Sequence, residues 1–113
     1  MFRKKNRLTK TKEIENVFKN GKRSYSNTLG FRFLKNQLEY NRFCVIISAK
    51  VSKKAVIRNK IKRQIRAVVE TENKLMLQGF DFLIITNKEI LDKDFLEVKE
   101  SIKDSFKVLK LYV

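Results

Sequence analysis

The chain has 113 residues and a formal net charge of +15, because 27 Lys and Arg residues stand against 12 Asp and Glu residues. This length predicts one domain over 1–113 with a single core, and the excess of positive charge favours a polyanionic partner such as a nucleic acid. The sequence has no His and a single Cys, so the usual general base of a protein nuclease and the usual zinc clusters are missing.

The apolar runs are all too short to span a membrane, and no signal peptide opens the chain. We therefore expect a cytoplasmic protein with no membrane partner. Cys44 lies in the apolar run 42–48, where a buried, reduced thiol is expected. The remaining candidates for metal binding are carboxylates that we expect at helix starts and on the surface: Glu13, Glu15, Asp92 and Asp94. No catalytic residue and no metal ligand is assigned to the protein.

The first residues, 1–7, are a basic arm with little to fold around. Such arms commonly become ordered only on a nucleic acid, so we expect flexibility to about residue 8. A short helix should follow from a cap at Thr9 or Thr11 and end at Asn20-Gly21. Its apolar residues are Ile14, Val17 and Phe18.

Three segments predict β-strands. Residues 29–34 alternate between a face with Leu29, Phe31 and Phe33 and a face with Gly30, Arg32 and Leu34. Tyr25 lies on a lead-in that is itself a possible short strand. The apolar runs 43–47 and 80–86 suit buried strands. A long helix separates these two runs, so they are expected to be parallel neighbours.

Residues 53–66 hold seven cationic side chains and no acidic one. Their apolar residues continue to Val68 at helical spacing and fall in an arc about 80° wide on a helix. The opposite side carries like charges four residues apart, which destabilise a helix, so a solvated surface is a poor explanation and phosphate binding a better one. We expect this helix to start near Ser52 and to continue as far as Gly79.

The last helix should start near Asp92 or Asp94 and bury a stripe that runs from Phe95 to Leu109. Its outer face mixes Lys with Glu and Asp, as an ordinary solvated face does. Together the elements predict an α+β fold, a two-layer sandwich with a mostly antiparallel sheet and helices packed on it.

The nine Phe residues are expected mainly in the core. An alternative for four aromatic residues is a floor on which unpaired RNA bases stack: Phe18, Tyr25, Phe31 and Phe33.

The run 55–66, Ala-Val-Ile-Arg-Asn-Lys-Ile-Lys-Arg-Gln-Ile-Arg, resembles the signature of the bacterial ribonuclease P protein subunit. The resemblance extends over nearly the whole chain, through Asn6-Arg7-Leu8, 17–21, 42–48 and the closing helix. It implies the small partner of a catalytic RNA that removes the 5′ leader from precursor tRNA, with Mg²⁺ held chiefly by the RNA. The implied fold is a mixed sheet of about four strands with three helices, in the order αβββαβα, with a left-handed βαβ crossover.

The resemblance also implies two sets of binding residues; it does not imply a protein oligomer. The set expected on the catalytic RNA comprises Lys50, Lys53, Lys54, Arg58, Asn59, Lys60, Lys62, Arg63 and Arg66. The set expected on the precursor tRNA leader, in a cleft between the first helix and the sheet, comprises Phe18, Tyr25, Phe31 and Phe33.

Some positions depart from the family pattern: Lys60 replaces the usual Arg, Cys44 a common Gly, Ile14 a frequent aromatic residue, and Ser48-Ala49-Lys50 a frequent Ser-Lys-Lys. Two rival functions fit the charge and fold class. One is a ribosomal-type or other RNA-binding module without a role in cleavage, and the other is a metal-dependent nuclease that acts alone.

Overall fold

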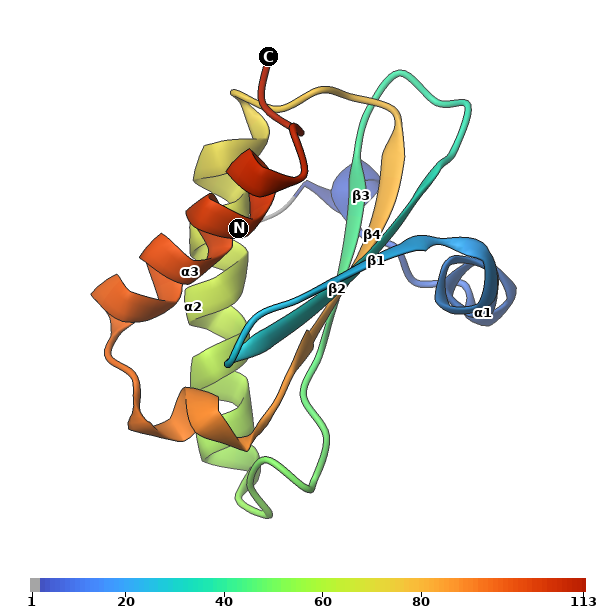
Figure 1. Ribbon diagram of the computed structural model, residues 1–113. Coiled ribbons are helices and arrows are strands. Elements are labelled where there is room, and N and C mark those ends of the chain that lie inside the picture. Colours follow the sequence, from blue (N-terminus) through green and yellow to red (C-terminus); the bar gives the residue numbers. More distant parts are fainter. Residues whose placement is uncertain (1–2) are drawn as a thin grey trace.

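A four-stranded sheet lies between helix α1 on one side and helices α2 and α3 on the other (Figure 1). The computed structural model describes residues 3–113. The elements in chain order are the 3-10 helix η1 (Lys4–Asn6), α1 (Thr11–Asn20), β1 (Lys22–Tyr25), β2 (Leu29–Lys35), β3 (Arg42–Ile46), α2 (Ala55–Asn73), β4 (Phe80–Thr86), the 3-10 helix η2 (Lys88–Asp92) and α3 (Phe95–Val108). The predicted αβββαβα order is confirmed.

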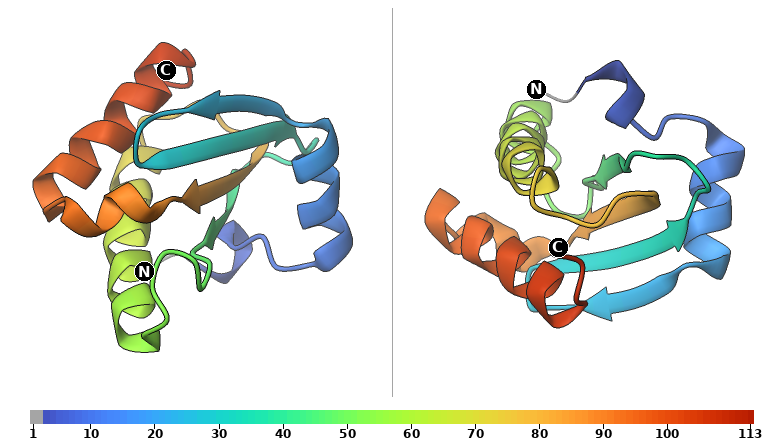
Figure 2. Two further views of the ribbon diagram at one scale, coloured as in Figure 1. Left: turned by 60° about the horizontal axis from the view of Figure 1, so that its bottom comes forward. Right: turned by 90° about the horizontal axis from the view of Figure 1, so that it is seen from above.

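The strands lie in the order β1-β2-β4-β3. Strand β2 pairs antiparallel with both β1 and β4, whereas β3 pairs parallel with β4, as the long helix between them predicts. From β3 the chain passes through α2 and returns to β4 (Figure 2). The crossover is left-handed, which the resemblance implied and which runs against the general preference for right-handed connections.

The main core lies between the sheet and helices α2 and α3. Phe82 is fully buried at its centre and stacks on Phe43, with ring centroids 4.9 Å apart. Helix α2 contributes Ile65 and helix α3 contributes Phe106, and neither has any exposed surface. The middle of each predicted apolar stripe is therefore buried in one core, whereas Phe95, where the stripe of α3 was predicted to begin, is 43 % exposed.

A smaller core holds α1 on the other face of the sheet. Its fully or almost fully buried residues are Leu8, Val17 and Leu83, and partly buried apolar residues surround them. Because few apolar side chains are buried here, polar contacts have a larger share in fixing α1 than they have for α2 and α3.

The helix ends differ from the predictions in three places. Helix α2 stops at Asn73, not near Gly79, and the carbonyl of Asn73 accepts a hydrogen bond from the Gln78 side chain. The N-caps of α1 and α2 are Lys10 and Lys54, without a side-chain cap. Only α3 begins as predicted, since Asp94 forms a capping box with Glu97. No helix in the described part of the chain is both long and apolar enough to cross a membrane.

Candidate nucleic-acid interface

Helix α2 turns its apolar stripe into the core and presents its cationic residues along its other sides. Ile61 and Ile65 are buried, so the predicted orientation of the helix is confirmed. The row Arg58, Lys62 and Arg66 is half-buried beside the sheet. The other predicted RNA-binding residues are exposed: Lys50, Lys53, Lys54, Asn59, Lys60 and Arg63.

Arg58 also orders the segment that leads into α2. Its Nη1 donates a hydrogen bond of 2.8 Å to the carbonyl oxygen of Ser52. The hydroxyl of Ser52 in turn accepts a hydrogen bond from the backbone N–H of Lys54. These bonds fix the backbone next to Lys53 and Lys54, so both lysines continue the cationic surface of the helix.

A hollow of about 280 Å³ connects this row to the α1 side of the sheet. Lys62 and Arg66 line it from α2, Arg7 from the N-terminal segment, and Ile14 and Cys44 lie beside them. Burial raises the pKa of the Cys44 thiol, and the charges of Lys62 and Arg66 only partly oppose the effect. The thiol is thus neutral at pH 7, half-buried rather than buried as predicted, and the hollow has a cationic rim around an apolar floor.

An arginine and two aromatic rings form the outer surface between α1 and β2. The guanidinium of Arg32 lies 3.8 Å from the ring centroid of Phe18, and it donates hydrogen bonds to the Phe18 carbonyl and the Tyr25 hydroxyl. Phe18 is 47 % and Tyr25 68 % exposed. Tyr25 packs over Gly30, where a Cβ atom would come within 3.2 Å of its ring. Phe18 and Tyr25 are therefore brought together, as the predicted leader site requires.

The prediction that Phe31 and Phe33 belong to the same accessible floor is wrong. Phe31 is 1 % exposed and packs edge-on against Phe106, at 5.4 Å between ring centroids. Phe33 is 7 % exposed and stacks on Phe82. Because side chains alternate along β2, both rings lie on the face of the sheet that α2 and α3 cover, and Arg32 lies on the face on which α1 packs.

Arg42 ties α1 to the sheet through an ion network. It donates two hydrogen bonds to the Glu13 carboxylate of α1, at 3.2 and 3.0 Å, and two to Asp81 of β4, at 2.8 and 2.7 Å. Asn36 adds a further bond to Asp81. Hydrogen bonding to Asp81 is the largest cause that raises the pKa of Arg42 above its ordinary value. This network fixes the N-terminal half of α1, while Arg32 contacts its C-terminal half.

In residues 3–8, Asn6 and Leu8 are buried against the protein and the four basic residues are exposed. The expectation that this segment has little to fold around is therefore wrong for Asn6 and Leu8, whereas the flexibility of the arm to about residue 8 stays a prediction; residues 1 and 2 lie outside the described part. Leu8 is buried and its N–H donates to the Phe43 carbonyl. Asn6 is 8 % exposed and donates to the Asn41 carbonyl at 2.7 Å. Asn6 and Leu8 are each bonded to a residue distant in sequence, in the segment before β3 or in β3 itself, so the local sequence shows no sign of these contacts.

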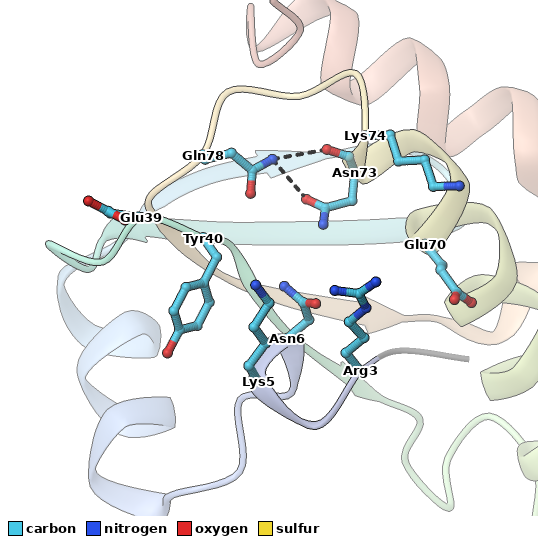
Figure 3. A pocket seen from close by; sticks show the side chains of 9 residues that line it. All are labelled: Arg3, Lys5, Asn6, Glu39, Tyr40, Glu70, Asn73, Lys74 and Gln78. Atoms are coloured by element: carbon cyan, nitrogen blue, oxygen red, sulfur yellow. Dashed lines mark hydrogen bonds between the residues drawn. The ribbon is translucent and has the colours of Figure 1, made fainter.

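Figure 3 shows the hollow in which this segment meets the C-terminal end of α2. The hollow has a volume of about 340 Å³. The ammonium of Lys5 lies 5.1 Å from the ring centroid of Tyr40, and Gln78 donates to Asn73 at the far side. Its lining mixes cations with carboxylates: Arg3, Lys5, Asn6, Glu39, Tyr40, Glu70, Asn73, Lys74 and Gln78. Because positive and negative side chains both line this hollow, it differs from the surface of residues 53–66, which carries positive charges alone.

Sequence reasoning missed Arg32 and the Arg42 network as parts of this interface. The position of Arg32 could be predicted, since it alternates with two phenylalanines along the strand and must lie on the opposite face of the sheet. An ion pair at Asp81 could also be predicted, because a carboxylate inside an apolar strand needs a charged partner. No local pattern linked Asp81 to Glu13, which is distant in sequence.

The chain matches the family model described as Ribonuclease P over residues 2–110. It is 39 % identical to the ribonuclease P protein component of Petrotoga mobilis over 83 % of this chain and 78 % of that protein. With the component of Bacillus velezensis the identity is 38 %, over 98 % and 95 %. A solved structure of the RNase P protein from Thermotoga maritima, in complex with 1-(4-fluorophenyl)-2-thiourea, superposes with a TM-score of 0.83 at 30 % identity, covering 89 % of this chain and 97 % of that one.

Proposed function

The chain belongs to the family of ribonuclease P protein components, subunits of the enzyme that processes the 5′ end of tRNA, and we propose how it binds RNA within that enzyme. Helix α2 binds the RNA subunit. The surface between α1 and β2 holds the leader of precursor tRNA. The observation that carries this proposal is the separation of the two surfaces, one purely cationic and the other aromatic with one guanidinium.

The α2 surface suits a structured polyanion. The three cations of its half-buried row follow each other at intervals of four residues, which costs helix stability in the free protein and is reversed when phosphates lie along the row. Arginines at 58, 63 and 66 can each hold a phosphate by two parallel hydrogen bonds. Lys60 offers charge without this fork, so its contribution is to affinity more than to geometry.

The α1–β2 surface suits an unpaired strand. Phe18 and Tyr25 present exposed rings on which bases can stack, and Arg32 between them offers a cation. Base stacking on an aromatic ring tolerates any sequence, as a subunit that meets many leaders needs. Phe31 and Phe33 are not part of this site, because they are in the core.

We propose further that the Mg²⁺ ions of the reaction are held by the RNA and not by this chain. In residues 3–113, no three His, Cys, Asp or Glu side chains lie close enough to hold a metal ion. Two of the carboxylates have other partners, since Asp94 caps α3 and Glu13 pairs with Arg42. In this proposal the chain's own residues bind and orient RNA, and hydrolysis of the phosphodiester takes place on the RNA subunit.

The test is cleavage of a precursor tRNA at low Mg²⁺ by the purified protein, by the RNA subunit, and by both together. We expect no cleavage by the protein alone and a large rate increase when it is added to the RNA. Cleavage by the protein alone would identify a nuclease in its own right. An unchanged rate of RNA-catalysed cleavage would identify an RNA-binding module outside this enzyme.

A further inference from the structure

One end of the sheet is left uncovered on the side of α2 and α3. Lys22 pairs with Phe33, and Lys35 pairs with Phe80. Since paired residues and residues two apart share a face, these four side chains lie on the same face as the core residue Phe82. The end of β2 that carries them points away from both helices (Figure 1).

A hollow of about 320 Å³ lies at this uncovered end. It is lined by Lys22, Phe33, Leu34, Lys35 and Phe80. The rings of Phe33 and Phe80 meet edge to face with centroids 6.0 Å apart. Phe80 is partly exposed and both lysines are exposed, and within the described part of the chain no carboxylate lines the hollow. The hollow therefore has an aromatic floor and a positively charged rim.

We propose that this hollow binds one unpaired nucleotide of RNA, with the base stacked on the partly exposed Phe80, which packs on the almost buried Phe33, and with the phosphates next to it between Lys22 and Lys35. Base stacking on an aromatic ring and ionic contact of lysine with phosphate are the two interactions by which proteins hold single strands. An acidic peptide would use the lysines but not the rings, and an apolar partner would use the rings but leave two lysines without counter-charges.

The hollow is a separate site from the leader surface. Phe33 and Phe80 face the α2 and α3 side of the sheet, whereas Arg32 and Phe18 lie on the α1 side. The proposal rests on the proposed function only in taking RNA as the partner. The nucleotide can come from the leader, as it continues past α1, or from the RNA subunit.

The first experiment uses the free protein and a dinucleotide, uridylyl-uridine, as the probe. In NMR titrations the ring signals of Phe80 and Phe33 should shift with the dinucleotide, and they should shift much less with inorganic phosphate. A second assay measures the affinity for a short single-stranded oligouridylate. The double variant Lys22→Gln/Lys35→Gln should bind it at least about five-fold more weakly, and Phe80→Leu, which keeps apolar volume but removes the ring, should weaken it by a similar factor.

The matched control is Lys88→Gln/Lys107→Gln, which removes the same charge from two exposed lysines elsewhere. Thermal unfolding of each variant separates loss of binding from loss of folding. Unmoved ring signals, or equal affinities for the test and control variants, would overturn the proposal. Such a result would leave the proposed function intact as long as the protein still stimulates cleavage by the RNA subunit.

Binding measurements on the reconstituted enzyme show whether the leader or the RNA subunit supplies the nucleotide. If the leader supplies it, Lys22→Gln/Lys35→Gln will weaken the binding of precursor tRNA but not of mature tRNA. If the RNA subunit supplies it, the variant will weaken assembly with that RNA instead. A variant that alters neither contradicts the site in the assembled enzyme.

Discussion

Phe18 is the one exposed phenylalanine of the proposed leader site. Phe18 is 47 % exposed, and the Arg32 guanidinium covers one face of its ring. The pair therefore holds a flat surface in place before any base arrives, which lowers the entropic cost of binding. Ile14, one turn earlier, is aliphatic and half-buried, so the proposed site has one aromatic ring on α1.

Replacing Phe18 by Ala should weaken binding of leader-bearing precursor tRNA to the assembled enzyme by about 1–3 kcal/mol and leave mature tRNA unaffected. Folding stability should change little, because half of the ring is already in water. Phe95→Ala removes a phenylalanine of similar exposure, 43 %, at the start of α3 and serves as the control. Equal effects of both variants on precursor binding would rule out stacking on Phe18.

Cys44 should be a slow nucleophile in spite of the two cations beside it. Burial raises the pKa of its thiol, and thiolate is the reactive form. Alkylation by iodoacetamide at pH 8 should accordingly be slower in the folded protein than in the protein unfolded in urea. Because the folded pKa lies above the unfolded one, the folded state should lose stability as the pH rises beyond the unfolded pKa. Equal alkylation rates in both states would contradict the neutral, half-buried thiol.

At the scale of elements, α1 is the helix whose position depends most on charge. Its apolar contact with the sheet is small, and Arg42 connects it to β4 through Glu13 and Asp81. The Arg42 and Asp81 side chains are 17 % and 9 % exposed, whereas Glu13 is 35 % exposed. The bond to Asp81 should thus be the stronger of the two, and the bond to Glu13 the more sensitive to salt.

Arg42→Gln should lower the free energy of unfolding by about 2–3 kcal/mol, since it leaves Asp81 without its charged partner. Glu13→Gln should lower it by less, about 1 kcal/mol or below, and the difference should shrink in high salt. Glu15→Gln, an exposed carboxylate on the same helix, is the matched control. Urea unfolding at two salt concentrations measures all three, and a Glu13 effect independent of salt would count against the ionic link.

Helix α2 is proposed to bind RNA, so changes to its cationic residues should alter affinity. Replacing Arg58, Arg63 and Arg66 together by Ala should weaken binding to the RNA subunit and lower the slope of log affinity against log salt by about 2–3, if each arginine neutralises one phosphate. The control replaces Lys99, Lys103 and Lys107 of α3 by Ala, on a face of mixed charge. A slope that is unchanged in the α2 variant would mean that this surface does not lie on the RNA.

The elements themselves were largely predictable from sequence, and their ends were not. The strand at 80–86 has the predicted bounds, because an apolar run between turn residues leaves little choice. Helix α2 was expected to continue through Leu75 and Leu77, whose spacing fits the stripe. Both leucines are exposed, 59 % and 42 %, since the chain turns at Asn73 into a network of amide side chains that involves Asn41 and Gln78. That network joins segments distant in sequence, so no local pattern reveals it.

The candidate site was predictable only in part, for a reason that β2 makes clear. Alternation showed that Phe31 and Phe33 share one face and that Arg32 has the other, but it did not show which face the larger core covers. Since two long amphipathic helices need more apolar area than α1 does, the two rings were needed for the core. The handedness of the crossover came from the family resemblance, because the general rule predicts the opposite hand.

The fold places the two proposed RNA-binding surfaces on different elements. The sheet separates α1 from α2 (Figure 2), while the hollow next to Cys44 brings Lys62 and Arg66 of α2 near Ile14 of α1. A single strand of RNA bound on the α1 side of the sheet can thus reach Lys62 and Arg66 of the α2 row. With a net charge of +15, the remaining surface adds general attraction for RNA without selecting a position.

We propose that α2 lies on the RNA subunit and α1 on the leader. Directed hydroxyl-radical cleavage shows which RNA lies near each helix in the assembled enzyme with precursor tRNA. An iron chelate is attached to the new thiol of the variant Ala67→Cys on α2 or Lys19→Cys on α1. Each variant also carries Cys44→Ala, so that the chelate has a single site of attachment. Both positions are exposed and neither belongs to a proposed contact set. We predict cuts in the RNA subunit from Ala67→Cys and cuts in the leader from Lys19→Cys. Cuts in the leader from α2 and in the RNA subunit from α1 would contradict the account.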